Sequence, residues 1–415
     1  MILASAFVLA ASLFSPALAE DLKVKRALAS IDERREPLIA EWIRVTEIPS
    51  PSGQERQRAA YIRAELAKLS VTDIKTDALG NVSALRKGIE SGPPIVLAAH
   101  MDTVFSMDTP IKVTRENGVL KAPGIGDDSV NVVALLETAR ALDRAGIALK
   151  RDVMFLFTVQ EETRLNGMMH WMKHSGVTPA SIVALDSRFG GLSYGAFRIS
   201  RLQFFYTSPG GHTLVSRGKP NPAKAVAKAI LDLYAIPLPD PASGTGQSRL
   251  PVMNVGKIGG GTVPNAIPEE AWFTVDLRSL DSPTQDRLLT QVVATAEAAA
   301  KHEGVGFRMT KPDGEDVDYS RARPSAERLA DPLVSTAKDV LEFVKANGGL
   351  PVEPVDGGAT DANVGVGYGI PSIAIGAGRS RNGHTVNEQS DESAMVPGTR
   401  MIVLLTCALA GIAER

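Results

Sequence analysis

The fold is decided by the stretch Pro94-Ile95-Val96-Leu97-Ala98-Ala99-His100-Met101-Asp102. Its first six residues form a continuous apolar run, which is typical of a strand buried on both faces of a parallel sheet. The run ends at a histidine, so polar side chains stand at the carboxyl end of the strand, where such sheets bind ligands. The segment therefore predicts an α/β domain with a functional site at this edge of the sheet.

The segments around this strand alternate between helical and strand patterns. The predicted strands are Val153–Val159, Ile182–Leu185 and Pro371–Ile375, and the predicted helices are Glu55–Ser70, Val130–Ala145, Ser325–Ala346 and Met401–Ile412. The last helix is apolar but shorter than the roughly 20 residues that cross a bilayer. The alternation predicts a mostly parallel sheet covered by helices on both faces.

A different pattern interrupts this alternation after about Phe197. Strand-like runs near 202–207, 253–258, 272–277 and 305–309 enclose helical runs at 222–234 and 283–302, with a Pro/Gly/Ser-rich loop at 237–248. The order β-α-β-β-α-β is that of a compact α+β sandwich. We expect one domain in two parts, 20–197 and 313–415, with an α+β domain inserted at 198–312.

Composition excludes several classes of protein. The formal net charge is −2, with 22% charged residues, so no basic surface for nucleic acid is expected. The single cysteine, Cys407, forms no internal disulfide and lies in an apolar stretch, as a buried, inert thiol does. Imidazole chemistry depends on six histidines, which are His100, His170, His174, His212, His302 and His384.

Residues 1–19 have the pattern of a signal peptide. Ile2–Phe14 is almost wholly apolar, and Ala17-Leu18-Ala19 has the small-x-small form of a cleavage site. The alternatives are a membrane anchor and a mis-called start. The run is shorter than the roughly 20 residues of a span, which argues against an anchor, whereas the absence of a Lys or Arg before it departs from the signal-peptide pattern. We expect cleavage after Ala19, a periplasmic or secreted protein, and no stable membrane insertion after cleavage.

Five potential metal ligands lie at or just beyond the ends of predicted strands, or in glycine-containing loops. Each alone has an ordinary interpretation: a surface His-x-Asp pair, an acidic helix N-cap, a solvated loop pair or a loop-initiating aspartate. Together, two imidazoles and three carboxylates suit two divalent cations about 3.5–4 Å apart. The five are His100, Asp127, Glu162, Asp186 and His384.

Two further carboxylates flank this set. Asp102 lies two residues beyond His100, so on a strand it shares a face with the imidazole and can fix its tautomer. Glu161 and Glu162 are adjacent, and in extended backbone such side chains point to opposite sides. That arrangement favours one carboxylate as a ligand and the other as a proton carrier.

The motifs resemble those of the co-catalytic dinuclear zinc exopeptidase family, which contains peptidase T, glutamate carboxypeptidase, aminoacylase and succinyl-diaminopimelate desuccinylase. The resemblance covers about residues 37–410, and Asp186 in place of Glu favours the peptidase T and glutamate carboxypeptidase branch. It implies a zinc-peptidase catalytic domain interrupted by a lid or dimerisation domain. The motifs are Ala99–Val104, Gly124–Asp128, Gln160–Glu162, Leu185–Ser187, Gly210–Thr213, Asn254–Thr262 and Gly383–Thr385.

The resemblance also implies residue roles. His100 and Asp186 bind one zinc, Glu162 and His384 bind the other, and Asp127 bridges them. Asp102 orients His100, and Glu161 is the general base for a metal-activated bridging water. His212 reaches the partner subunit's active site to stabilise the oxyanion, so a homodimer is implied. Asn265 and Arg278 hold a substrate carboxylate, the alternatives being a turn asparagine and a surface arginine. One departure is Ser129-Val130-Asn131, where the family commonly has Lys-Gly or Lys-Ala.

The resulting hypothesis is an exported metallo-exopeptidase, either aminopeptidase or carboxypeptidase, that cleaves small peptides with two Zn²⁺ ions. Mn²⁺ or Co²⁺ also accept this ligand set. The alternative within the enzyme class is an N-acyl amino acid deacylase or carbamoyl-amide hydrolase. A non-catalytic peptide-binding relative is the alternative outside it, and the intact Glu161 argues against that. His170, His174 and His302 are interpreted as surface or packing residues.

Overall fold

The computed structural model describes residues 11–239, 251–280, 282–312, 316–345 and 351–413. Within it the chain forms two compact units. The first unit is Met1–Ala196 with Val317–Arg415, and the second unit is Phe197–Asp316. The sequence analysis places the inserted domain at 198–312.

A six-stranded sheet forms the centre of the first unit. Its order is β1-β2-β6-β3-β7-β14, and the last four strands are parallel while β1 and β2 form an antiparallel edge. This confirms the predicted mostly parallel α/β architecture, although the sequence analysis missed β1 and β2. The strands are β1 (Thr72–Thr76), β2 (Val82–Arg86), β3 (Ile95–His100), β6 (Val153–Thr158), β7 (Ser181–Leu185) and β14 (Ser372–Ile375).

The central strand β3 is buried on both faces. Ile95, Leu97 and Ala99 belong to one hydrophobic cluster, whereas Val96 and Ala98 belong to another. Alternate residues therefore point into two separate cores, which explains the continuous apolar run in the sequence.

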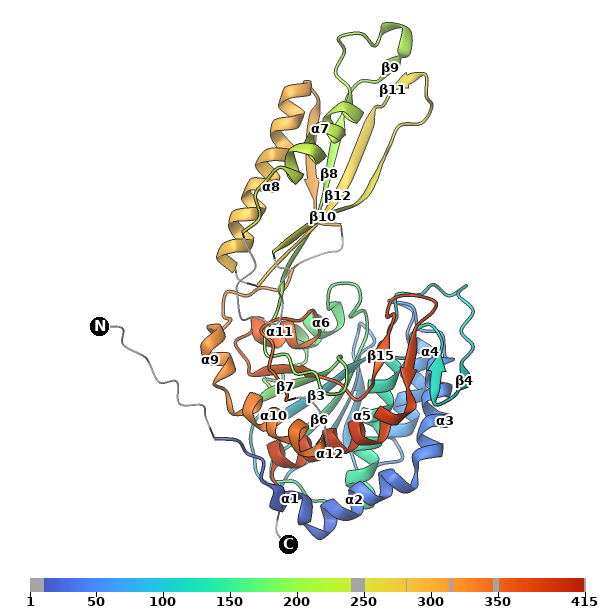
Figure 1. Cartoon of the computed structure of the whole chain (residues 1–415), viewed down its shortest axis with the longest axis vertical. Coiled ribbons are helices and arrows are strands. Elements are labelled where there is room, and N and C mark those ends of the chain that lie inside the picture. Colours follow the sequence, from blue (N-terminus) through green and yellow to red (C-terminus); the bar gives the residue numbers. More distant parts are fainter. Residues whose placement is uncertain (1–10, 240–250, 281, 313–315, 346–350, 414–415) are drawn as a thin grey trace, which may run out of the picture. The chain divides into compact units, whose positions relative to one another are not determined.

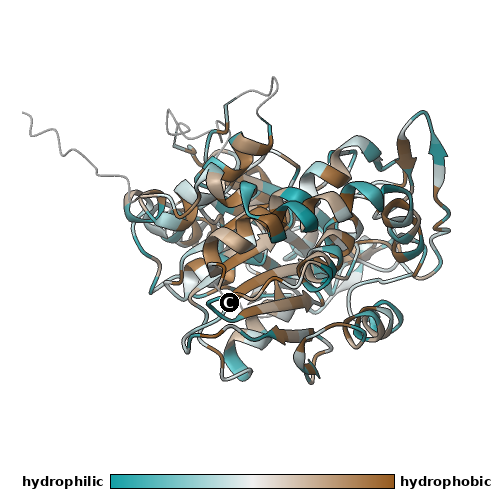
Figure 2. Cartoon of the chain, turned by 90° about the horizontal axis from the view of Figure 1, so that it is seen from below, coloured by the Kyte–Doolittle hydropathy of each residue, from teal (hydrophilic) through white to brown (hydrophobic). Residues whose placement is uncertain are grey.

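Helices cover both faces of this sheet (Figure 1). The larger core includes α2 (Leu22–Glu33), α3 (Arg35–Thr46), α4 (Arg56–Leu66), α5 (Ser129–Arg144), α10 (Pro332–Val344) and α12 (Met395–Ala410). The smaller core includes α6 (Asn166–His174) and α11 (Ala362–Gly367). In Figure 2 the apolar, brown stretches gather in the sheet and in the helices around it.

A small antiparallel sheet lies beside this layered core. Its order is β15-β16-β5-β4, so it joins two segments far apart in the sequence. The strands are β4 (Thr114–Glu116), β5 (Val119–Lys121), β15 (Ser380–Arg381) and β16 (Gln389–Asp391). The pairing of β16 with β5 brings the loop after β14 next to the loop before α5.

Two helix predictions in the first unit were wrong in extent. The expected helix Ser325–Ala346 is divided into α9 (Ser325–Leu329) and α10, because Asp331 caps a new helix that starts at Pro332. The closing helix α12 begins at Met395 rather than Met401. The run Glu392–Ala410 is long and apolar enough to cross a membrane, but 78% of its most apolar window is buried inside the protein.

The described part of the expected signal peptide contacts the first unit. Ser15 caps α1 (Pro16–Glu20), and the Phe14 ring meets the Phe343 ring edge-on at 5.3 Å. Ala19, after which cleavage is expected, is buried in α1. Residues 1–10 of this segment lie outside the described residues.

The second unit is an antiparallel sheet with two helices on one face. The sheet order is β10-β12-β8-β13, and Phe204, Tyr206 and Phe273 fill the core beneath the helices. The elements are β8 (Arg198–Thr207), α7 (Pro222–Tyr234), β10 (Val252–Gly260), β12 (Glu270–Ser279), α8 (Ser282–Glu303) and β13 (Gly306–Thr310), which confirms the predicted β-α-β-β-α-β order. Most of the loop expected at 237–248 lies outside the described residues.

Candidate metal centre

The carboxyl ends of three neighbouring parallel strands bring the candidate ligands together. His100 is the last residue of β3, Asp186 follows β7 directly, and Glu161 and Glu162 follow β6. Because β6, β3 and β7 are adjacent and parallel, their carboxyl ends meet at one edge of the sheet. Two loops add Asp127, before α5, and His384, after β14.

Asp127 lies between the two imidazoles. Its Oδ1 is 3.0 Å from Nε2 of His100, and its Oδ2 is 3.0 Å from Nε2 of His384. Nε2 of His100 also lies 4.0 Å from Oδ1 of Asp186, and Nε2 of His384 lies 3.0 Å from Oε1 of Glu162. A carboxylate with one oxygen toward each of two imidazoles has the geometry that a bridging ligand needs.

The donor set fits divalent cations. In His100–Asp127–Asp186 and in Asp127–Glu162–His384, the ligand atoms of each group all lie within 4.8 Å of one another. Oε1 of Glu162 is buried yet accepts no hydrogen bond of proper geometry from any described residue. Such a buried oxygen needs a partner, and a cation supplies one. Imidazole nitrogens and carboxylate oxygens suit Zn²⁺, Mn²⁺ or Co²⁺.

Electrostatic coupling among these groups is strong. Burial alone lowers the pKa of His100, but the charge of Asp128 and the contacts with Asp102 and Asp127 outweigh it and raise that pKa well above its ordinary value. The contact with Asp127, followed by that with Glu162, raises the pKa of His384 to about 10. The raised pKa values of the two histidines therefore show that the surrounding carboxylates favour positive charge at this place.

The carboxyl groups of the centre differ in the direction in which their pKa values are shifted. Burial raises the pKa of Glu161 well above its ordinary value, and the charge of Asp186 adds to this. Burial likewise raises the pKa of Asp186 to about 7. The pKa of Asp127 is lowered despite burial, because both imidazoles contact it. Burial thus favours a protonated Glu161, whose ligand atom lies within 4.8 Å of those of His100 and Glu162.

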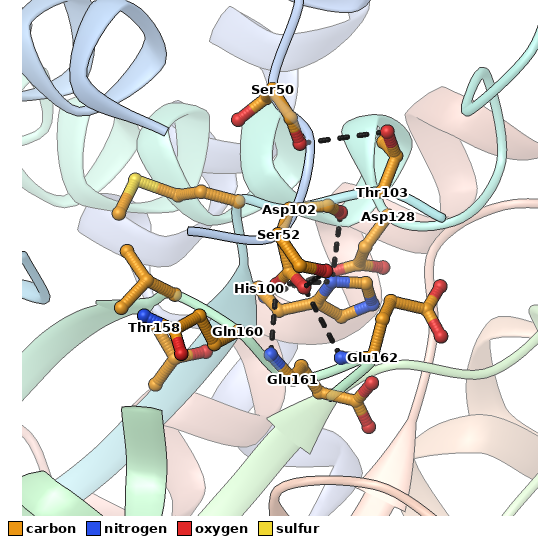
Figure 3. A network of polar contacts seen from close by, with 12 residues as sticks. Ser50, Ser52, His100, Asp102, Thr103, Asp128, Thr158, Gln160, Glu161 and Glu162 are labelled. Carbon is orange, nitrogen blue, oxygen red and sulfur yellow. Dashed lines mark hydrogen bonds and ion pairs between the residues drawn. The ribbon is translucent and has the colours of Figure 1, made fainter. Parts of the chain in front are cut away.

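Asp102 fixes the orientation of His100 and of the loop after β6 (Figure 3). Nδ1 of His100 donates to the backbone carbonyl of Asp102 at 3.1 Å, and the Asp102 carboxylate lies 3.4 Å away. A carbonyl only accepts, so this contact places a proton on Nδ1 and directs Nε2 toward Asp127. The same carboxylate accepts from the backbone N–H groups of Glu161 and Glu162 and from Oγ of Ser52.

Asp128 occupies the N-cap position of α5, but its side chain makes no capping hydrogen bond. Its carboxylate accepts instead from the backbone N–H of His100 at 3.1 Å and from Nδ2 of Asn131 at 2.6 Å. Oδ1 of Asn131 accepts from the N–H of Ala377 at 2.7 Å. Asn131, part of the departure from the family's usual Lys-Gly, therefore links β3 to the loop that carries His384.

Sequence reasoning missed several buried groups around the centre. Asp361, at the start of α11, accepts from Oγ1 of Thr158 at 2.5 Å, and burial raises its pKa to about 6. Glu388 is fully buried, and burial raises its pKa to about 7. Glu388 lies four residues after His384, but the motif quoted for that histidine ends at Thr385, and no pattern marks Glu388. Asp361 had no signal either, since it follows no predicted strand.

The other candidate residues belong to the second unit. His212 forms β9 (Gly211–His212), which pairs with β11 (Ala266–Ile267), and the N–H of Thr213 donates to the carbonyl of Asn265. This brings His212 and Asn265 together. Arg278 lies apart from them on β12 and binds both oxygens of Asp276, at 2.9 and 3.2 Å.

The remaining histidines and the cysteine lie outside this centre. On α6 the rings of His170 and His174 lie 4.5 Å apart, centroid to centroid, and are tilted by 44°, and His302 contacts Glu303 at 3.2 Å. Burial raises the pKa of Cys407 to about 12, consistent with an inert thiol.

Comparison with known proteins gives a consistent result. The family model described as peptidase family M20/M25/M40 matches residues 96–407. The uncharacterized protein YqjE of Bacillus subtilis (strain 168) is 25% identical over 391 residues, covering 90% of this chain and 98% of that protein. The succinyl-diaminopimelate desuccinylase of Corynebacterium glutamicum is 25% identical over 353 residues, covering 83% of this chain and 89% of that protein.

Solved structures share the fold. The aminopeptidase PepT of Bacillus cereus superposes with a TM-score of 0.69 at 22% identity, covering 91% of this chain and 99% of that chain. The YXEP protein of Bacillus subtilis, described as a dinuclear metal binding peptidase, superposes with a TM-score of 0.64 at 18% identity, covering 92% of this chain and 100% of that chain.

Proposed function

Because the chain belongs to peptidase family M20/M25/M40 and is thus a metal-dependent hydrolase of peptide or other amide bonds, we propose that it is an exopeptidase of small peptides. The observation that carries this proposal is the placement of Glu161 beside five ligand-type side chains at one sheet edge. A protein that only bound peptides would have no use for a buried carboxyl poised to carry a proton.

The contacts support the following residue roles. His100 and Asp186 would hold one cation, Glu162 and His384 would hold the second, and Asp127 would contact both. Bound there, two divalent cations, Zn²⁺ in our proposal, polarise the scissile carbonyl and acidify the attacking water. Glu161 accepts the proton of that water and delivers it to the leaving amine nitrogen as the C–N bond breaks.

Residues of the second unit complete this proposal. The imidazole of His212 donates to the oxyanion in the active site of the partner subunit, which requires a homodimer. The guanidinium of Arg278 and the amide of Asn265 bind the substrate carboxylate, as a guanidinium fork suits that anion. In the structure Asp276 occupies the fork of Arg278, so substrate competes with Asp276 for it.

A second candidate function is hydrolysis of an N-acyl amino acid or a carbamoyl amide by the same centre. The observation in its favour is the relative whose printed name is a succinyl-diaminopimelate desuccinylase. Its reaction breaks the same type of bond, so the metal centre serves either substrate. A panel of dipeptides, tripeptides and N-acyl amino acids, read by mass spectrometry, separates the two functions.

The variant Glu161→Gln tests the proton carrier. We expect two bound cations per chain, as in the wild type, and a fall in kcat of about 10²–10⁴-fold, which is the usual contribution of a general base. Metal analysis and turnover on the best substrate of the panel measure both quantities. Wild-type turnover in this variant would rule out the proposed role.

Mixing two inactive variants tests the partner-subunit role of His212. Combined His212→Ala and Glu161→Gln subunits form mixed dimers in which one active site is intact, so random exchange restores about a quarter of the wild-type sites. Size-exclusion chromatography checks dimerisation. If mixed dimers form and the mixture still shows no activity, the trans arrangement is contradicted.

We also propose that the protein is exported, with cleavage after Ala19. The apolar run and the small-x-small site support this. Expression with its own leader in a Gram-negative host should give a periplasmic protein whose intact mass lacks residues 1–19. A full-length mass confined to the cytoplasm would contradict export.

A further inference from the structure

The side chain of Glu388 accepts hydrogen bonds from three backbone N–H groups of the loop that carries Asp127. Its Oε2 accepts from the N–H of Gly124, and its Oε1 accepts from the N–H groups of Gly126 and Asp127, each at 2.8 Å. The carboxylate is fully buried. It is not among the five ligand-type side chains, so its role is separate from theirs.

The loop depends on this carboxylate for its shape. It connects β5 to α5, and its other contacts include the N–H of Ile125 with the carbonyl of Ala122 and Nε1 of Trp42 with the carbonyl of Ile125. At its end the Asp128 carboxylate accepts from the N–H of His100. Without Glu388, three buried N–H groups lose their acceptor, and each such loss costs about 1–3 kcal/mol. The backbone at Asp127 therefore takes its position chiefly from Glu388.

Glu388 also belongs to the segment that carries His384. Its own N–H donates to the carbonyl of Thr385, and its carbonyl accepts from the N–H of Ala122. One residue thus closes the turn after His384 and fixes the loop before α5. These two loops supply the ligands that do not come from the strand ends.

We propose that Glu388 is a positioning residue that holds the Asp127 carboxylate between His100 and His384, and so sets the affinity of the metal pair. The proposal rests on the proposed function, because Asp127 matters to metal binding only if the centre holds cations. Glu388 touches neither substrate nor metal in this role; it acts through the backbone of Asp127.

The experiment compares Glu388→Gln with Glu392→Gln. In Glu388→Gln an NH₂ group replaces one acceptor oxygen and opposes the loop N–H donors. We expect affinity for Zn²⁺ to fall about 10–100-fold, as for other groups that orient metal ligands. At saturating Zn²⁺ we expect kcat to fall and KM to stay within about twofold, since substrate contacts are unchanged.

Glu392 is the matched control because it is also a buried carboxylate of this segment, but it binds Arg115 and Arg35 rather than the loop. Glu392→Gln should lower the melting temperature and leave Zn²⁺ affinity unchanged. Competition with a chromophoric chelator measures affinity without substrate. The Glu388 proposal is thus tested even if every amide in the panel proves inert, and a wild-type protein that binds no Zn²⁺ would instead refute the proposed function.

Wild-type Zn²⁺ affinity in a folded Glu388→Gln protein would overturn the inference. If that variant does not fold, Glu388→Asp decides, because it keeps the charge but is one methylene too short to reach all three donors. The expected result for Glu388→Asp is a Zn²⁺ affinity below that of the wild type with an unchanged KM. If Glu388→Asp binds Zn²⁺ as tightly as the wild type does, Glu388 does not set the metal affinity and has only a structural role.

Discussion

At the scale of single residues, the candidate centre is built from side chains that orient one another. Asp102 shows this most clearly, because it contacts His100 and also accepts the N–H groups of Glu161 and Glu162. It therefore aligns the candidate ligand His100 at the end of one strand with the proposed proton carrier Glu161 after the next. Loss of its charge should affect both metal binding and proton transfer.

The variant Asp102→Asn measures this effect. We expect metal affinity and kcat to fall about 10–100-fold each, because an amide accepts fewer of these hydrogen bonds and removes the negative charge 3.4 Å from the imidazole. Chelator competition and steady-state kinetics check the two quantities. Ser52→Ala is the milder comparison, since it removes only one hydrogen bond to the same carboxylate. Unchanged metal affinity in Asp102→Asn would show that His100 needs no such partner.

Sequence patterns led to the five ligand-type residues and to Asp102, but not to the other groups that hold them. His100, Glu162 and Asp186 were identifiable because strand ends are visible as apolar runs. Glu388 and Asp128 were not, because they bind backbone N–H groups, which every residue carries and no sequence pattern marks. The separation of 264 residues between Glu388 and Gly124 hides that contact further.

At the scale of elements, the close approach of β14 to the end of β7 supports Asp186. The N–H of Asp186 donates to the carbonyl of Ile375, the last residue of β14. A Cβ on the next residue, Gly376, would lie 1.6 Å from the carbonyl oxygen of Ser187. Only glycine fits at this position without displacing backbone.

The variant Gly376→Ala should therefore lower the free energy of unfolding by about 1–3 kcal/mol, the usual cost of overpacking a tight contact. Metal affinity should fall as well, because Asp186 moves with the strand end. Gly383→Ala is the control, since a Cβ there meets no atom within 4 Å. Chemical denaturation and chelator competition compare the two. Equal stability for both variants would contradict the expected clash.

Sequence patterns predicted where most helices and strands lie better than where each one begins and ends. The division of the expected helix at Pro332 was predictable, because proline belongs in the first turn of a helix and Asp331 before it is a good cap. β1 was harder to find, because its five residues are largely exposed and carry no apolar alternation. Packing against β2, not local pattern, defines it.

At the scale of the whole molecule, metal content and pH should act together on stability. Burial raises the pKa of Asp186 to about 7 and that of Asp361 to about 6, both above the ordinary value of 3.8. A buried carboxyl with a raised pKa favours the folded protein while it stays protonated. Its contribution to the free energy of unfolding is therefore full below pH 3.8 and is lost as the pH rises through 6 to 7. The metal-stripped protein should therefore lose stability between pH 5 and 7, whereas bound cations favour the charged carboxylates and oppose the loss.

Thermal melting of stripped and Zn²⁺-loaded protein across this pH range measures the effect. Asp361→Asn isolates one group, because it removes a titrating carboxyl and should flatten the decline of the stripped protein. A stripped wild type whose melting temperature rises from pH 5 to 7 would contradict the assigned sign.

The insertion of the second unit imposes an order on the assembly of the first. The strand β14, the ligand His384 and the core helix α12 all follow Phe197–Asp316 in the chain. During vectorial synthesis the second unit can fold on its own core while the central sheet still lacks its last parallel strand. A chain exported unfolded, as we propose, would complete the candidate metal centre only after its final hundred or so residues arrive, so hydrolytic activity would be withheld from the nascent chain in transit.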